Sequence, residues 1–332
     1  MRSVIAIVTK LCAAMVAALL LTTSLSGQVP LNPRAGTIKP EMQIKRSDHL
    51  GPARDKYRFQ DIDVEEAQSY TAIFDINNWG LAVGDYVDAA NNFNAFLWRN
   101  GDRKPLADPT GTLTNMVKVN DRGLVIGDTG SIAVQHAAVF KLATGTWTLL
   151  PDVAGKTQNY AMDMNNAGRG VGQACEGDWN NPMNCVGWMW DGNTYTFTNI
   201  PGTTSNYTGP LAINDRGQVV GQYLDDGGHM HTYLLEHSKM TILDVPGASD
   251  TVVNDISSSG EVILDALYGD LSTNPNQNFL WRRGVYTPLP NHPDPAAVHT
   301  FSLGMNDRGD WCGRWFDENW VSHAFIAFRQ SP

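Results

Sequence analysis

The most regular pattern in the chain is a short apolar strand followed by a polar turn that ends in glycine. The turn Asn77-Asn78-Trp79-Gly80 returns at residues 120–123, 165–168, 214–217, 257–260 and 306–309. The turn glycines are 43, 45, 49, 43 and 49 residues apart. Asparagine at the first turn position and glycine at the fourth, where φ must be positive, are typical of a tight hairpin. The pattern therefore predicts six copies of one repeat.

Each repeat has room for four short strands around this turn. The strand before the turn always ends on an apolar residue, and a second strand such as residues 218–221 follows it. Counted from the turn glycine, 13 to 18 residues precede a third strand, and a short polar turn leads to a fourth strand, such as residues 146–150. Four antiparallel strands in about 45 residues is the size of one propeller blade.

The two ends of the repeat array complement each other. The sixth repeat stops at Phe328, after its third strand, while residues 57–64 resemble a fourth strand without a repeat of its own. We predict an all-β fold: a six-bladed β-propeller of four-stranded antiparallel blades over residues 56–330, closed by the N-terminal strand completing the last blade. An open β-solenoid is the alternative, but it leaves the missing strand unexplained.

The residues before the repeats have a different character. Arg2 and Lys10 precede an apolar run at residues 11–21, and small residues lead to Ser26. This is typical of a secretory signal peptide over residues 1–26, cleaved near Ser26. Residues 27–55 contain several prolines among mixed charges and are expected to form a linker or flexible arm. The mature protein is expected to be periplasmic or extracellular, without a membrane span.

Charge and composition narrow the function classes. The formal net charge of −10 becomes −12 when the signal peptide leaves, which argues against binding to nucleic acid phosphates. A hydrophobic fraction of 42% excludes disorder over most of the chain. We expect a monomer.

Three cysteines remain after signal removal. Cys175 and Cys185 flank a nine-residue insertion, which a disulfide could close in an oxidising compartment. Cys312 takes the place of Val83 and Val220 in other repeats, so we expect it in the core.

The repeat also carries a family resemblance. The Ile-Asn-Asp-x-Gly turn at residues 213–217, the later Gly221 and the sequence His323-Ala324-Phe325 resemble the bacterial HAF family of extracellular repeat proteins. The resemblance covers residues 57–329 and implies secretion and a propeller-like array, but no substrate. Repeat 5 departs most, with Leu264 where a glycine is expected.

The loops between second and third strands vary in length, whereas the turns do not. These loops share one end of the blades with the blade-to-blade connections, so we expect recognition on this loop face. Aromatic rings beside carboxylates suit carbohydrate, because apolar sugar faces stack on rings and hydroxyls donate to acids. The expected ligand contacts are Trp179, Trp320, Tyr86, Tyr223, Trp315, Asp178 and Asp317.

These aromatic candidates fall into two groups. Tyr86, Tyr223 and Trp315 share one repeat position, which also fits packing. Trp179 and Trp320 lie outside the repeat phase and are the stronger candidates.

A second candidate site lies on the innermost strands. Asp75, Asp163 and Asp255 occupy one position in alternate repeats and could hold a hard cation such as Ca²⁺ in the central channel. The alternative is that they line a hydrated channel, with Lys118 neutralising one charge. We expect no other cofactor.

Two functions fit these patterns. The first is a secreted, non-catalytic recognition propeller that binds extracellular polysaccharide or a cell-surface partner. The second is a carbohydrate-active hydrolase, or a metal-dependent lactonase-type hydrolase, that uses channel-facing carboxylates. The sequence is repetitive at the axis and irregular at the loops, which favours binding over catalysis.

Overall fold

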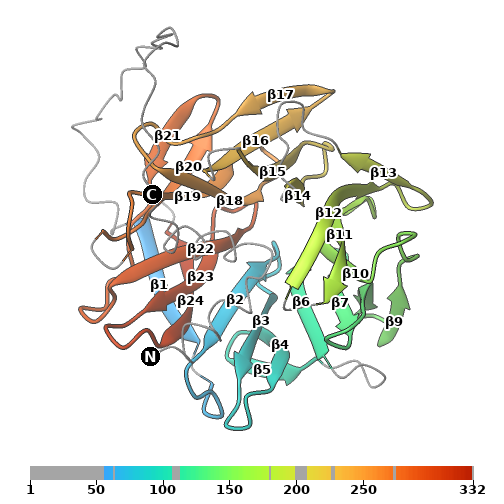
Figure 1. The fold of residues 1–332 in the computed structure, drawn as a ribbon. Coiled ribbons are helices and arrows are strands. Elements are labelled where there is room, and N and C mark those ends of the chain that lie inside the picture. Colours follow the sequence, from blue (N-terminus) through green and yellow to red (C-terminus); the bar gives the residue numbers. More distant parts are fainter. Residues whose placement is uncertain are drawn as a thin grey trace, which may run out of the picture.

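The computed structural model describes residues 56–62, 64–106, 113–178, 181–198, 208–225, 229–271 and 274–330. These ranges contain no α-helix, and their strands surround a central axis, so the fold is an all-β propeller (Figure 1). The expected signal peptide, the expected arm and Trp179 lie outside the described residues.

Each repeat contributes strands in a fixed order. The innermost strands, which precede the turns, are β2 (Thr71–Ile76), β6 (Leu113–Val119), β10 (Gln158–Met164), β14 (Thr208–Ile213), β18 (Asp250–Ile256) and β22 (His299–Met305). The second strands are β3 (Ala82–Val87), β7 (Leu124–Gly130), β11 (Gly170–Asp178), β15 (Val219–Leu224), β19 (Val262–Leu267) and β23 (Trp311–Phe316). The third strands are β4 (Phe93–Arg99), β8 (Gln135–Lys141), β12 (Asn181–Trp190), β16 (Met230–Glu236), β20 (Gln277–Arg282) and β24 (Ser322–Arg329). The outermost strands are β5 (Asp102–Pro105), β9 (Thr146–Leu149), β13 (Tyr195–Thr198), β17 (Lys239–Ile242), β21 (Val285–Pro288) and β1 (Tyr57–Ile62).

The strands pair as antiparallel neighbours. Four sheets contain four strands, and a fifth sheet contains eight. The eight-stranded sheet consists of two antiparallel units, β6–β9 and β10–β13, that meet at one parallel bridge between Gln135 and Gln158.

The two ends of the described chain meet in one sheet. β1 pairs antiparallel with β24, from Tyr57 opposite Arg329 to Ile62 opposite Ala324. The resulting sheet has the order β1-β24-β23-β22, so the N-terminal strand supplies the fourth strand beside the last three.

The turn of repeat 1 shows why asparagine opens these hairpins. The side-chain oxygen of Asn77 accepts the N–H groups of Trp79 and Leu81, both at 3.0 Å. The N–H of Gly80 donates to the backbone oxygen of Asn77, and Gly80 has a φ of 73°. Asparagine therefore stabilises the turn from its side chain, and glycine adopts the left-handed conformation without steric cost.

A bulge precedes the axial position of every innermost strand. In β2, Ile73 lies opposite Gly84 and Asp75 lies opposite Val83, which leaves Phe74 as an extra residue. The same register shift occurs in β6, β10, β14, β18 and β22. Because a bulge changes the direction of the residues that follow it, it can turn a polar side chain such as Asp75 toward the axis.

Apolar side chains fill the layers between neighbouring units. One layer joins Ile76 and Phe96 in repeat 1 to Cys312 and Ile326 in repeat 6. Cys312 is a free thiol and fully buried, which confirms its assignment to the core.

Candidate functional site

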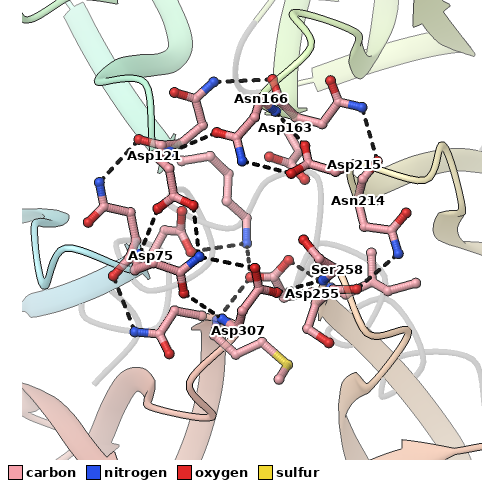
Figure 2. Close-up of a pocket in the computed structure, with 18 of the residues that line it drawn as sticks. Asp75, Asp121, Asp163, Asn166, Asn214, Asp215, Asp255, Ser258 and Asp307 are labelled. Carbon is pink, nitrogen blue, oxygen red and sulfur yellow. Dashed lines mark hydrogen bonds and ion pairs between the residues drawn. The ribbon is translucent and has the colours of Figure 1, made fainter.

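A pocket opens at the axis on the turn face, the end of the propeller formed by the Asn-x-x-Gly turns (Figure 2). Every repeat contributes the end of its innermost strand and the first two residues of its turn. The pocket lining contains six aspartates and one lysine, Lys118. Asp75, Asp163 and Asp255 are buried, while Asp121, Asp215 and Asp307 are half-buried or exposed.

The three buried aspartates join neighbouring repeats. Each carboxylate accepts a backbone N–H from the innermost strand of the next repeat, at 2.8 to 2.9 Å. The donors are Val119 for Asp75, Ile213 for Asp163 and Met305 for Asp255. Each aspartate therefore links its own repeat to the following one, which joins repeats 1 and 2, 3 and 4, and 5 and 6.

Lys118 supplies the positive charge among these carboxylates. Its Nζ lies 2.6 Å from Oδ2 of Asp255 and 3.6 Å from Oδ1 of Asp75. Burial lowers the pKa of Lys118, but the carboxylates outweigh burial and raise the pKa above its ordinary value. Burial raises the pKa of Asp75 and of Asp163 to about 7, against the opposing effect of Lys118. The site therefore holds a charged ammonium with more carboxylates than it can neutralise.

These residues do not fit the expected Ca²⁺ site. Backbone N–H groups engage all three carboxylates, and the cation beside Asp75 and Asp255 is the Lys118 ammonium. Within the described ranges, no group of three or more His, Cys, Asp or Glu side chains is arranged to hold a metal ion. The geometry favours the lysine-neutralised alternative over the Ca²⁺ site.

Hydrogen bonds also link the turns around the axis. At five joints the side-chain N–H of the first turn residue donates to the backbone oxygen of its counterpart in the next repeat, at 2.9 to 3.2 Å. Ser257 occupies this position in repeat 5 and has no amide group to donate. The ring of hydrogen bonds is therefore interrupted between repeats 5 and 6.

The second turn residues form an outer ring around the pocket mouth. They alternate between amide and carboxylate side chains, except at Ser258, in the order Asn78, Asp121, Asn166, Asp215, Ser258 and Asp307. Nδ2 of Asn78 donates to Oδ2 of Asp121 at 2.7 Å and to Oδ2 of Asp307 at 3.0 Å. The side-chain N–H groups of Asn78 therefore donate to the carboxylates on both sides, and the side-chain amide of Asn166 donates to Asp215.

The structure reveals a polar belt that the sequence reasoning missed. One position on the second strands holds a buried polar residue in every repeat: Asp85, Asp128, Gln173, Gln222, Asp265 and Arg314. Asp265 accepts the hydroxyl of Ser302, on the innermost strand of the next repeat, at 2.8 Å. Burial raises the pKa of Asp85 and of Asp265 to about 7 and that of Asp128 well above its ordinary value. The available signal was a polar residue directly after the second glycine in five repeats, and directly after Leu264 in repeat 5.

The repeat-locked aromatic residues on the loop face pack against the protein. Trp315 is buried, stacks on His323 at 4.1 Å and on His292 at 5.0 Å, and donates its indole N–H to Asp61. This packing leaves the indole of Trp315 little surface to offer a ligand.

Tyr86 and Tyr223 are half-buried. Tyr223 stacks on His231 at 5.1 Å, and the Arg103 guanidinium lies over the ring of Tyr86. No ring contact joins Tyr86, Tyr223 and Trp320 in the described part of the chain. The structure therefore does not gather the expected aromatic contacts into one site.

The two carboxylates expected to contact a ligand, Asp317 and Asp178, have different surroundings. Oδ1 of Asp317 accepts the N–H groups of Asn319 and Val321, so this carboxylate holds the β23–β24 loop in shape. Asp178 is exposed at the end of β11. A disulfide joins Cys175 in β11 to Cys185 in β12 and closes the hairpin that ends in Asp178.

Among the expected ligand contacts, Trp320 remains accessible to a ligand. Its side chain is 39% exposed, and its ring stacks on the buried His299 at 5.2 Å with an interplanar angle of 28°. Its φ is 62°, in the left-handed region that bulky side chains rarely adopt. Asn91 has the same conformation at the corresponding turn position of repeat 1, with a φ of 63°.

Comparisons with known proteins point to the fold rather than to an activity. The sequence matches no protein-family model and no curated protein. Among solved structures, a gluconolactonase from Xanthomonas campestris is similar with a TM-score of 0.54 at 11% identity, over 90% of this chain and 99% of that chain. The structure of AofleA from Arthrobotrys oligospora matches with a TM-score of 0.53 at 11% identity, over 83% of this chain and 87% of that chain.

A third similar structure is the Aleuria aurantia lectin in complex with a fucose-containing disaccharide. Its TM-score is 0.50 at 10% identity, over 80% of this chain and 94% of the lectin. The described residues include no helix of the length and apolarity that a membrane crossing requires. At these identities the likenesses establish that the chain has a propeller fold.

Proposed function

We propose that the protein is a secreted recognition propeller without catalytic activity, and that it binds carbohydrate on the loop face at Trp320. Within this proposal, the two units of the eight-stranded sheet are separate blades, so the closed ring has six blades. We also assign the repeats to the HAF family, on the turn and His-Ala-Phe residues. The Cys175–Cys185 disulfide supports an oxidising compartment outside the cytosol.

The conformation of Trp320 is the observation that carries the proposal. A left-handed backbone costs a bulky L-residue about 1–2 kcal/mol, and asparagine, found at the corresponding position in repeat 1, tolerates it better. The indole is nevertheless partly exposed rather than packed in the core. Strain that is retained at an exposed site favours a functional role over a packing role.

The surroundings of Trp320 suit a sugar ring. His299 supports one side of the indole by stacking, which fixes the ring as a platform. Asp317 and the exposed Glu318 lie in the same loop and can accept hydroxyl protons. An apolar pyranose face on the indole, with hydroxyls directed to these acceptors, is the arrangement expected for carbohydrate. The lectin among the similar structures supports this ligand class.

The hydrolase alternative has less support at the axis. Asp75, Asp163 and Asp255 are buried, and backbone N–H groups and Lys118 engage them. A general acid or base must reach the substrate directly or through one water molecule. The similar gluconolactonase keeps lactone hydrolysis as the second candidate, to be tested on the same protein.

The test is binding of the chain from residue 27 to residue 332 to an array of bacterial and fungal polysaccharides. We expect at least one glycan to bind, and we expect Trp320→Asn to weaken that binding roughly tenfold or more, the equivalent of about 1.4 kcal/mol. Phe197→Ser is the matched control, because it removes an aromatic side chain that is 53% exposed on the outermost strand β13.

Two results would count against the proposal. Unchanged glycan binding by Trp320→Asn would remove Trp320 from the site. Hydrolysis of aldonolactones that disappears in Asp255→Asn would establish the enzyme reading instead.

A further inference from the structure

Trp79 interrupts a regular pattern on the turn face. The third turn residue is Arg122, Arg216 and Arg308 in repeats 2, 4 and 6, and Ala167 and Ser259 in repeats 3 and 5. In repeat 1 the residue is Trp79, whose side chain is 65% exposed. This is the most exposed of the large hydrophobic side chains among the described residues. Turn geometry does not explain it, because arginine, alanine and serine form the same turn.

The indole of Trp79 is held in place although it is exposed. Its Nε1 donates to the backbone oxygen of Asp121 at 3.1 Å, in the turn of the next repeat. Because the polar edge of the indole is satisfied by the protein, the remaining exposed surface is apolar. A ring that is both exposed and oriented loses little entropy when a flat apolar surface stacks on it.

The carboxylates nearest Trp79 are hydrogen-bond acceptors, and the guanidinium of Arg308, which also lies near this turn, donates to Asp310. Asn78 uses its Nδ2 on Asp121 and Asp307, so the amide has no free donor at this side of the mouth. Each carboxylate oxygen can accept more than one hydrogen bond and keeps spare capacity. The mouth therefore favours a ligand that brings donors, such as hydroxyl or ammonium groups.

The charge of the pocket selects between these donors. Its lining holds six aspartates and the single lysine Lys118, and the carboxylates that a ligand can reach are those of Asp121, Asp215 and Asp307. Lys118 itself shows that an ammonium group is stable among these carboxylates, at 2.6 Å from Asp255. A positively charged donor beside an aromatic ring gains further from the negative face of the ring.

We propose a second binding site on the turn face, in which Trp79 stacks on a hexosamine and the carboxylates of Asp121 and Asp307 receive its free ammonium group. The site lies at the opposite end of the strands from Trp320, because turns and loops occur at opposite ends of each second strand. It goes beyond the loop-face function and does not depend on Trp320.

The experiment titrates the chain from residue 27 to residue 332 with a hexamer of glucosamine and follows binding by calorimetry. We expect binding that weakens with added salt, since charged groups carry part of it. Trp79→Arg, which introduces the residue of repeats 2, 4 and 6, should weaken binding roughly tenfold. Asp307→Asn should weaken it as well, and the melting temperature of each variant reports whether the fold is intact.

The controls separate this site from the loop face. The N-acetylated hexamer has the same rings without the ammonium and should bind at least about tenfold more weakly. Phe197→Ser, which removes an exposed aromatic ring that belongs to neither proposed site, should bind the glucosamine hexamer like the parent chain. Equal affinity for the two hexamers would overturn the ammonium assignment, and unchanged binding by a folded Trp79→Arg would overturn the site. If Trp320→Asn abolishes binding of the glucosamine hexamer and Trp79→Arg does not, the turn-face site is rejected and the loop-face proposal stands.

Discussion

The two faces of the propeller differ in how much of their structure is repeated. On the turn face, turns of constant length are joined by side-chain hydrogen bonds at five joints around the axis. On the loop face, the loops differ in length, a disulfide joins the paired strands β11 and β12, and one loop holds Trp320 in a left-handed conformation. The comparison indicates that the repeated links between turns lie on one face, while the loops of the other face are free to vary.

The largest expected effect tests the charge balance behind the turn face. Lys118→Met leaves Asp75, Asp163 and Asp255 buried without a cation, so we expect the free energy of unfolding to fall by about 3–5 kcal/mol. Urea unfolding followed by tryptophan fluorescence measures this change.

The controls for Lys118→Met use an exposed lysine and a second substitution. Lys104→Met, at a side chain that is 74% exposed, should change stability by less than about 0.5 kcal/mol. Adding Asp255→Asn to Lys118→Met should restore part of the loss, because it removes one unpaired charge. A loss from Lys118→Met no larger than that from Lys104→Met would contradict the role given to this lysine.

The second prediction tests what the loop face contributes to stability. Replacing Cys175 and Cys185 by serine opens a loop with a sequence separation of 10. The chain-entropy account expects a loss of about 2.5 kcal/mol. Thermal unfolding of the double variant and of the reduced parent should agree. A change confined to the reduced parent would indicate that the reductant acts elsewhere.

The third prediction concerns the polar belt between the faces. Burial raises the pKa of Asp85 and Asp265 to about 7, so the folded protein keeps protons that the unfolded chain releases above about pH 4. The stability from this protonation is complete below about pH 4 and is lost as the pH rises through 7.

Urea midpoints between pH 5 and pH 8 measure this dependence. We expect a loss of about 2 kcal/mol per group across that range, and Asp265→Asn should flatten the curve because it removes one of the titrating groups. Stability that does not fall with pH over this interval would show that the buried carboxyl groups of the folded protein do not retain their protons into the neutral range.

The smallest expected effect sharpens the assignment of Trp320. In Trp320→Asn, relief of the left-handed strain offsets the lost stacking on His299, so stability should change by less than about 0.5 kcal/mol. Trp320→Ala loses the stacking without gaining a residue suited to positive φ, and should be less stable by about 1 kcal/mol. Equal stability of the two variants would mean that the backbone conformation is not strained.

The propeller fold could be predicted because its signals are local and repeated. The Asn-x-x-Gly turns and the apolar residue that ends each innermost strand recur at nearly constant spacing. The N-terminal strand could be assigned because residues 57–64 lack a repeat of their own while the last repeat lacks a strand. The burial of Cys312 in the core could be predicted from its repeat position alone.

The candidate sites were harder to predict, because they depend on which side chains meet across repeats. The alternation of Asp75, Asp163 and Asp255 was visible, but their hydrogen bonds to the next repeat arise from strand placement around the axis. Tyr223 and Trp315 each face a histidine across the strand pair, a contact that requires the register. The conformation of Trp320 depends on a turn whose shape Asp317 sets.

The pairing of β1 with β24 has a consequence for how the chain acquires its structure. The hydrogen bond from Trp315 to Asp61 spans 254 residues, and nearly the whole chain must be synthesised before it can form. During synthesis, β1 has an exposed backbone edge that could associate with other chains until β24 is available. Arg58 and Asp61 place opposite charges on this short strand, a feature that discourages wrong partners until the C-terminus arrives. Ring closure should therefore be the last and slowest step of folding, since it requires the most distant contact.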